Sequence, residues 1–148
     1  MIQGLYEVHF QVEDLDRSVE FYQKLGLTPA WRNDVVAFMW IEPEKSWLGL
    51  WQKPGGNHVF AKHIAFRINF QDMPEAIRWL KEKGIEPVKD GRFEPVEPVV
   101  RPFQRNASLY FEDLDGHNLE LICTIPDDNS PGLPKMHWSE WEKLRAKK

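Results

Sequence analysis

An imperfect internal repeat limits the folds open to this chain more than any other feature. Each copy begins with a strand-like stretch that contains a histidine, His9 in the first copy and His63 in the second. A helix-like stretch follows in each copy and ends at a glycine, Gly26 or Gly84. The repeat predicts two modules that share one topology.

The later part of the repeat matches residues 38–50 with residues 109–121 without a gap, so Gly49 corresponds to Glu120. The two histidines and this one carboxylate are then expected at equivalent strand positions of the two copies. Two imidazoles and a carboxylate can hold a divalent ion and leave coordination positions open. We therefore predict a metal site built from His9, His63 and Glu120.

Alternation of polar and apolar residues assigns side chains to the two faces of each expected strand. In 6–12 the apolar residues alternate with His9 and its polar neighbours, and His63 and Glu120 likewise lie on the face away from the core. The further residues that we predict on this ligand face are Gln11, Met39, Trp47, Trp51, Arg67, Ser108 and Tyr110.

Each copy is expected to run strand, helix, then three strands. Asp14 is predicted to cap the first helix. Asp72 and Glu75 resemble a capping box for the second helix, with Pro74 in its first turn. The second copy carries an insertion within Val88–Asn106, for which two interpretations stay open: a lid or specificity loop, and a solvated hairpin extension or dimer contact.

We predict one domain over residues 1–125, made of modules at about 1–54 and 58–125, then a linker and a C-terminal helix over 126–148. His58 is expected to be exposed between the modules. The only cysteine, Cys123, excludes an intrachain disulfide, is expected to be buried and inert, and suits a reducing cytoplasm.

Charge and hydropathy narrow the class of partner. The formal net charge of -4 argues against a nucleic-acid binder, which needs a concentrated basic face. The sequence has neither an export signal at its start nor an apolar run of bilayer length. We therefore expect a cytoplasmic protein whose partner is a small molecule, without nucleic-acid or membrane contacts.

Two stretches carry a resemblance to a known family. The segments 9–22 and 111–121, together with the duplicated plan, resemble the glyoxalase, bleomycin-resistance and extradiol-dioxygenase superfamily, whose members are also called vicinal oxygen chelate proteins. The resemblance covers residues 5–124. It implies an α+β fold in which two βαβββ modules form curled mixed sheets around a shared cleft, and it implies a homodimer.

The resemblance also implies a ligand set. In metal-binding members the ligands come from the first and last strands of each module, which here correspond to His9, Gly49, His63 and Glu120. Glycine offers neither a ligand nor a base, so a glyoxalase I reaction is disfavoured. The three remaining residues fit a lyase, thiol transferase or dioxygenase that binds a vicinal-oxygen substrate on Mn, Zn, Fe, Ni or Mg.

The pattern is closest to the fosfomycin-resistance thiol transferases, which have similar strands around His63 and Tyr110 and a tryptophan at the position of Trp47. Those enzymes also hold the phosphonate with an arginine after the carboxylate strand, whereas residues 121–134 contain no arginine or lysine. Gln11 replaces an expected small polar residue. These differences favour another small oxygen-chelating substrate.

Within that resemblance, Tyr110 and Ser108 are predicted to orient the substrate, and Arg67 or the insertion is predicted to neutralise its charge. A second function class remains open. Some members of the superfamily have lost the metal and bind drugs in an aromatic cleft, which Trp47, Trp51 and Met39 would line here.

Overall fold

The structure is a computed structural model that describes residues 4–55, 59–126 and 132–147. His58 and most of the predicted linker after Pro126 lie outside the described residues. The chain divides into two compact units. Unit 1 contains residues 1–62 and 113–117, and unit 2 contains residues 63–112 and 118–148.

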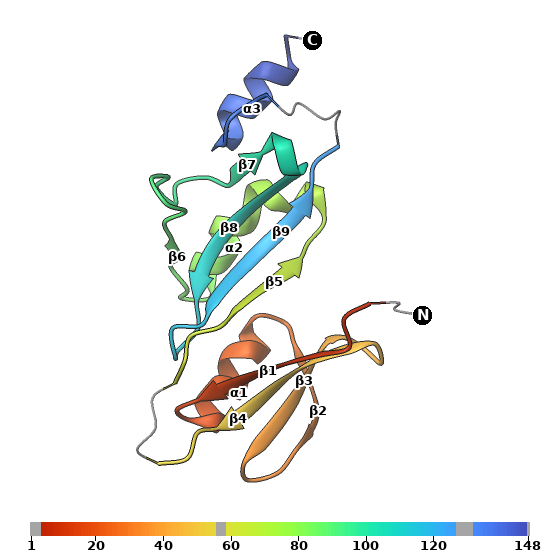
Figure 1. The fold of residues 1–148 in the computed structure, drawn as a ribbon, viewed down its shortest axis with the longest axis vertical. Helices are drawn as coiled ribbons and strands as arrows, with labels where there is room; N and C mark the ends of the chain where they lie inside the picture. The colour runs from red at the N-terminus through yellow and green to blue at the C-terminus, as the bar shows by residue number, and fades with distance from the viewer. Residues whose placement is uncertain (1–3, 56–58, 127–131, 148) are drawn as a thin grey trace. The chain divides into compact units, whose positions relative to one another are not determined.

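Unit 1 is a four-stranded sheet with a helix on one face (Figure 1). Its sheet has the order β1-β4-β3-β2, with β1 parallel to β4 and the other pairs antiparallel. The helix α1 contacts β3 and β4. The elements are β1 (Glu7–Val12), α1 (Leu15–Lys24), β2 (Thr28–Arg32), β3 (Val36–Glu42) and β4 (Ser46–Gln52).

Local signals define α1 as predicted. The side chain of Asp14 accepts a hydrogen bond from the Arg17 backbone N–H at 3.0 Å, which caps the first turn. After the helix, Gly26 takes a φ of 95°, and Leu27 N–H donates to the Tyr22 carbonyl. The buried side chains of α1 pack with those of β1, β3 and β4, among them Phe10, Val12, Leu15, Val19, Tyr22, Met39, Leu48 and Leu50.

Unit 2 contains a six-stranded sheet with the order β10-β7-β8-β9-β5, and β6 also pairs with β8. The strands β5 and β9 are parallel. The elements are β5 (His63–Arg67), the 3-10 helix η1 (Phe70–Glu75), α2 (Ala76–Glu82), β6 (Pro87–Val88), β7 (Val99–Arg101), η2 (Pro102–Gln104), β8 (Asn106–Glu112), β9 (Asn118–Thr124), β10 (Met136–His137) and α3 (Trp138–Arg145).

The predicted α+β class and the two βαβββ-like modules are confirmed. The predicted start of the second helix is wrong. Asp72 and Glu75 form no capping box, because a 3-10 turn that contains Pro74 occupies this stretch and α2 begins only at Ala76. Asp72 instead accepts a hydrogen bond from the Asn69 amide at 3.1 Å.

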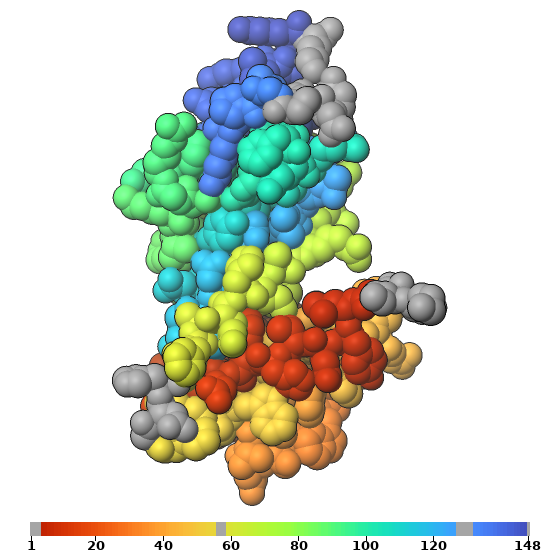
Figure 2. All heavy atoms as spheres, in the orientation of Figure 1, coloured from red at the N-terminus to blue at the C-terminus, as the bar shows by residue number. Residues whose placement is uncertain are grey.

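The insertion within Val88–Asn106 is partly built into the sheet. Its strand β7 pairs with β8 on one side and with β10 on the other, and all three β7 residues are buried. The teal region that includes β7 and the blue C-terminal segment lie side by side in Figure 2, as the pairing of β7 with β10 requires. A fully solvated extension therefore does not describe this stretch.

The turn between β8 and β9 belongs to unit 1. His117, expected to be an ordinary hairpin residue, is 0% exposed and stacks on Phe10 with ring centroids 4.3 Å apart. Its Nδ1 accepts from the Lys62 N–H at 3.0 Å, and its Nε2 lies 2.7 Å from the Gln11 carbonyl oxygen. Both ring nitrogens are therefore hydrogen bonded inside unit 1.

None of the helices in the described residues is long and apolar enough to cross a bilayer.

Candidate functional site

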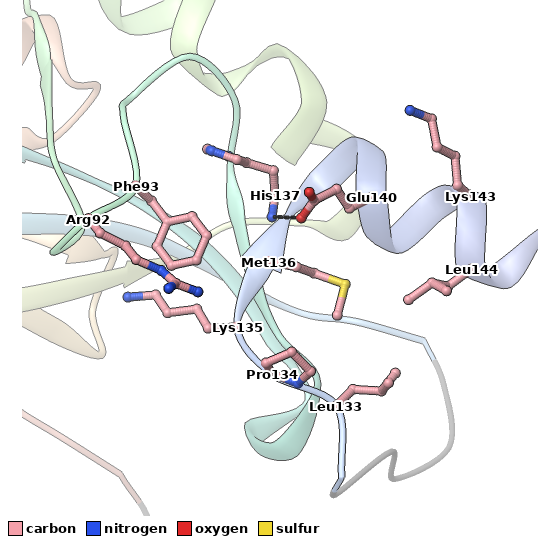
Figure 3. A pocket seen from close by; sticks show the side chains of 10 residues that line it. All are labelled: Arg92, Phe93, Leu133, Pro134, Lys135, Met136, His137, Glu140, Lys143 and Leu144. Carbon is pink, nitrogen blue, oxygen red and sulfur yellow. Dashed lines mark hydrogen bonds between the residues drawn. The ribbon is translucent and has the colours of Figure 1, made fainter.

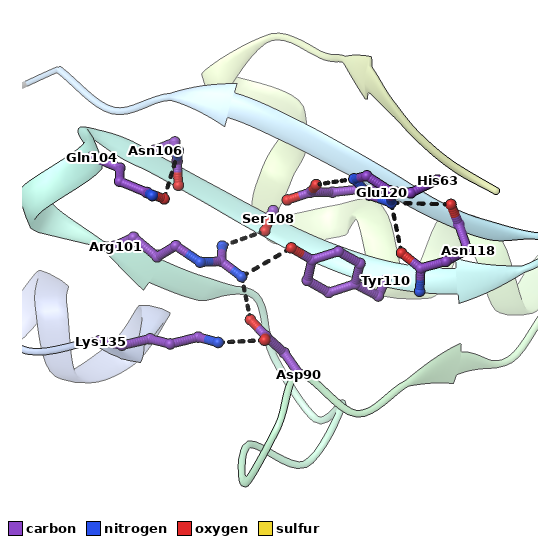
Figure 4. Close-up of polar contacts among 10 residues, drawn as sticks. All are labelled: His63, Asp90, Arg101, Gln104, Asn106, Ser108, Tyr110, Asn118, Glu120 and Lys135. Carbon is purple, nitrogen blue, oxygen red and sulfur yellow. Dashed lines mark hydrogen bonds and ion pairs between the residues drawn. The ribbon is translucent and has the colours of Figure 1, made fainter.

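His63 and Glu120 lie together on one face of the unit 2 sheet (Figure 4). They come from the neighbouring strands β5 and β9, and His63 Nε2 lies 3.2 Å from Glu120 Oε2. The Glu120 side chain is 7% exposed, whereas that of His63 is 50% exposed. The structure thus forms a half-site, which we define as His63 and Glu120, with a buried carboxylate and an accessible imidazole.

Neighbouring oxygens determine which nitrogen of His63 carries a proton. Its Nδ1 lies 3.1 Å from the Asn118 backbone oxygen and 2.7 Å from Asn118 Oδ1. A carbonyl oxygen only accepts, so Nδ1–H is the donor, and Nε2 faces the Glu120 carboxylate. A proton on Nε2 or a bound metal ion would satisfy both atoms at this distance.

Tyr110 stands next to the half-site on β8, opposite Glu120 in the sheet. Its ring centroid lies 6.0 Å from that of His63. Burial raises the pKa of the Tyr110 phenol above 10.0, the neighbouring Arg101 opposes this shift, and the adjacent Glu120 adds to it. The hydroxyl is therefore neutral at neutral pH, and it is the donor in its hydrogen bond with Glu120.

Arg101 connects this region to the insertion and the C-terminal segment. Its guanidinium donates to Ser108 Oγ at 2.6 Å, to the Tyr110 hydroxyl at 3.1 Å and to the Asp90 carboxylate. Lys135 Nζ also donates to Asp90. The sequence predicted that the insertion neutralises substrate charge, but it did not indicate which residue does so. The pairing of β7 with β8 places Arg101 beside Ser108 and Tyr110.

Ser108 and Arg67 also lie on the predicted face. Ser108 is 0% exposed beneath Arg101, and Arg67 is exposed opposite Ile122. Cys123 is buried and unpaired, and burial raises the pKa of its thiol, as an inert cysteine requires.

His9 lies in unit 1, where both of its nitrogens have partners. Its Nδ1 accepts from the Trp51 indole N–H at 2.7 Å, and its Nε2 lies 3.3 Å from Glu7 Oε1. Glu7 also accepts from the Trp47 indole N–H at 2.8 Å. The hydrogen bond from Trp47, and then that from His9, lower the pKa of the Glu7 carboxyl.

Gly49 makes room for the His9 ring. A Cβ atom at this position would lie 2.4 Å from His9 Nδ1 and 3.2 Å from Phe38 Cε1. The imidazole therefore covers the position that corresponds to Glu120 in the repeat. Gly49 has no side chain, and the His9 ring occupies the space that a side chain at position 49 would fill.

Sheet register corrects the predicted equivalence of the two histidines. His9 lies opposite Gly49, but His63 lies opposite Asn118, two residues before Glu120. If Gly49 and Glu120 correspond, the residue of β1 that corresponds to His63 is Glu7, which lies opposite Trp47. The statement that His9 and His63 occupy matching positions is therefore wrong.

Aromatic rings cover the same face of the unit 1 sheet. Trp47 packs against Phe38 and Trp40, with centroids 4.9 Å and 4.8 Å away, and Trp51 contacts His9. The placement of Met39 on this face is wrong. Met39 lies opposite Leu48 in the sheet and is fully buried in the core with it, which leaves Phe38 and Trp40 on the ligand face.

Gln11 of β1 lies opposite Trp51 of β4 and is exposed on the predicted ligand face. Within the described residues, no three His, Cys, Asp or Glu side chains lie together in a way that could hold an ion. The set of His9, His63 and Glu120 has members in both units, so it stays a prediction.

The family model for the Glyoxalase/Bleomycin resistance protein/Dioxygenase superfamily matches residues 4–121. The chain belongs to this superfamily. The two βαβββ-like modules agree with the superfamily resemblance found in the sequence.

Relatives within the superfamily include antibiotic-resistance proteins. The metallothiol transferase FosB of Staphylococcus haemolyticus (strain JCSC1435) is 31% identical over 133 residues, covering 82% of this chain and 84% of the relative. The structure of the fosfomycin resistance protein FosX from Listeria monocytogenes, complexed with Mn(II) and sulfate, matches with a TM-score of 0.62 at 25% identity, covering 85% of this chain and 94% of FosX.

A second structure with a similar fold is that of the integron cassette protein HFX_CASS4 from the mobile metagenome of Halifax Harbour Sewage Outfall. It gives a TM-score of 0.67 at 25% identity and covers 82% of this chain and 99% of that protein. This chain is thus a superfamily member related to FosB and FosX.

Proposed function

We propose that the chain is a divalent-metal-dependent enzyme that binds a small substrate through vicinal oxygens. The observation that carries this proposal is the half-site, in which Nε2 of His63 and a Glu120 oxygen lie 3.2 Å apart. The name of FosB, a metallothiol transferase, and the Mn(II) bound to FosX support it.

The donor set fits a divalent ion. Metal bonds to histidine nitrogen and carboxylate oxygen are about 2.0–2.2 Å long, and two such bonds at roughly a right angle span about 3 Å. Asn118 holds Nδ1–H of His63, which is the usual outer contact of a metal-binding histidine. An imidazole with a carboxylate suits Mn, Fe, Ni or Zn better than Mg.

A third ligand is proposed from β1 of unit 1. The sequence favours His9, whose Nδ1 and Nε2 are hydrogen bonded to Trp51 and Glu7. The register favours Glu7, the counterpart of His63. Glu7 would add a carboxylate to the half-site, and His9 would add an imidazole. Single substitutions of these two residues distinguish the two assignments.

When bound, the ion would act as a Lewis acid and as a template for two substrate oxygens. When Glu120 binds the ion, the neutral Tyr110 hydroxyl would turn its hydrogen bond from Glu120 to a substrate oxygen. Arg101 offsets negative charge on the substrate, and Ser108, fully buried, fixes the direction of the guanidinium. Gln11 is exposed on the sheet of unit 1 and Arg67 on the sheet of unit 2, and both stay proposed substrate contacts.

The reaction class that the relatives support best is transfer of a thiol to an electrophile chelated through oxygen. The thiol would come from solution, because Cys123 is buried. The absence of arginine and lysine from residues 121–134 favours a substrate other than fosfomycin. Lyase and dioxygenase reactions are the competing outcomes. A homodimer belongs to the proposal and is tested by the mass of the protein in solution.

Metal analysis tests the proposal. Protein purified without chelator, stripped and titrated with Mn²⁺ is expected to bind about one ion per chain with at least micromolar affinity. His63→Ala and Glu120→Gln are expected to abolish tight binding, and a drop for either His9→Ala or Glu7→Gln identifies the third ligand. His137→Ala, on β10, is the matched control. Wild-type protein that binds no divalent ion overturns the proposal.

The aromatic face of unit 1 favours a second candidate, a metal-free protein that binds flat aromatic molecules. Trp31 and Trp51 are 54% and 40% exposed there. Tryptophan quenching by an aromatic drug, unchanged by chelator and reduced by Trp51→Ala, supports this function. A thiol- and metal-dependent turnover in a panel of epoxides, diols and hydroxy acids supports the enzyme.

A further inference from the structure

Unit 2 has an open hollow beside the C-terminal helix, with a volume of about 680 Å³ (Figure 3). Small-molecule sites usually measure about 300–1,000 Å³. The walls come from the turn that contains Arg92 and Phe93, from the segment around β10, and from the outer face of α3. None of the residues of the proposed metal site lines it, although Lys135 shares Asp90 with Arg101.

Several of the side chains that line the hollow are basic. Arg92, Lys135 and Lys143 line it, and Glu140 is the acidic residue among its lining side chains. Glu140 accepts a hydrogen bond from the backbone N–H of His137 at 3.2 Å, and Lys135 is paired with Asp90. In the described part of the chain, neither Arg92 nor Lys143 has a carboxylate partner within ion-pair distance.

An aromatic ring lies among these charges. The guanidinium carbon of Arg92 lies 5.2 Å from the centre of the Phe93 ring, and Lys135 Nζ lies 5.3 Å from it. Such contacts hold cations at a ring face. Met136 and Leu144 add apolar surface to the wall, as Figure 3 shows.

We propose that this hollow binds a small organic anion, a carboxylate or phosphate carried on an apolar body. Arg92 supplies charge that no carboxylate of the described chain satisfies, and a charge-assisted hydrogen bond to an anion would use it beside Phe93, where Lys135 adds a second positive charge. Phe93, Met136 and Leu144 cover the apolar body. The C-terminal segment, which lies beyond the residues of the family match, would then add a ligand site to the domain.

Titration of the full chain with phenyl phosphate, followed by ¹H–¹⁵N spectra, tests this inference. Saturable shifts are expected at the backbone amides of Arg92, Phe93, Lys135 and His137, weaker shifts with inorganic phosphate, and none with benzyl alcohol. Equal shifts with benzyl alcohol, or no saturation with phenyl phosphate by about 10 mM, would overturn the proposal.

A charge-matched pair of variants completes the test. Arg92→Gln is expected to weaken phenyl phosphate binding by roughly tenfold or more, because a charge-assisted contact is lost. Lys81→Gln removes the same charge from an exposed helix position and should leave binding unchanged. Both residues are exposed, so the fold is preserved. Equal loss in both variants shows a general charge effect and refutes the site.

Discussion

Replacement of His117 by alanine should strongly destabilise the protein, although the sequence shows this histidine only as a turn residue. The ring is 0% exposed, stacks on Phe10 and bonds through both nitrogens to the Lys62 N–H and the Gln11 carbonyl. The same turn is held by Asp113, whose carboxylate accepts from the Tyr22 hydroxyl at 2.7 Å. His117 therefore joins β1 to the turn within unit 1.

The loss can be estimated contact by contact. A buried backbone group that loses its partner costs about 1–3 kcal/mol, and His117→Ala leaves two such groups. The stacked ring pair contributes about 0.5–1.5 kcal/mol more. Lys62 is exposed, so water partly replaces one partner, and we expect a total loss of roughly 3–5 kcal/mol. This is a large share of the roughly 5–15 kcal/mol by which domains are stable.

Urea unfolding of metal-free protein measures this loss. His117→Phe keeps the ring against Phe10 and removes both hydrogen bonds, so its loss should be smaller than that of His117→Ala by about the value of the stacking. His63→Ala, at a half-exposed position, is the control and should change stability by less than about 0.5 kcal/mol. A loss below about 1 kcal/mol for His117→Ala would refute the reasoning.

Two further predictions concern the ligand faces. Gly49→Ala should displace the His9 ring and break its hydrogen bond to the Trp51 indole. The free energy of unfolding should still change by less than about 1 kcal/mol, because alanine also reduces the conformational freedom of the unfolded chain, which offsets the lost hydrogen bond. Unchanged His9 and Trp51 side-chain resonances would contradict this prediction. The raised pKa of Tyr110 means that its contribution to stability is complete below pH 10.0 and is lost as pH rises through the folded pKa. Wild type should therefore lose more stability than Tyr110→Phe between about pH 9 and about pH 11, and a phenol that titrates at or below the usual value in the difference spectrum would count against it.

Local signals predicted much of the fold correctly. The Asp14 cap, the glycine after α1 and the alternation in β1 and β9 depend on neighbours in sequence, and the structure contains each of them. Pro74 is the local exception. It was expected within the first turn of a helix, but the stretch around it forms a 3-10 turn and delays α2 to Ala76.

These local signals do not determine strand register, which is the pairing of residues between neighbouring strands. A slip of two residues leaves every side chain on the same face, so alternation places His9 correctly on its face and still matches it with the wrong partner. Met39 was assigned to the wrong face because the face of β3 depends on its pairing with β4. Arg101 was not singled out because its contacts depend on β7, a three-residue strand inside the insertion.

The difference in hydrogen bonding between the two ligand faces gives the duplicated architecture two unequal halves. On the first sheet, indole donors already occupy the polar atoms of Glu7 and His9, and large rings form the remaining surface. On the second sheet, His63 Nε2 faces the Glu120 carboxylate. Directed evolution that varies only the aromatic side chains of the first sheet, and keeps Glu7 and His9, could therefore change which molecules bind while the proposed metal ligands stay constant.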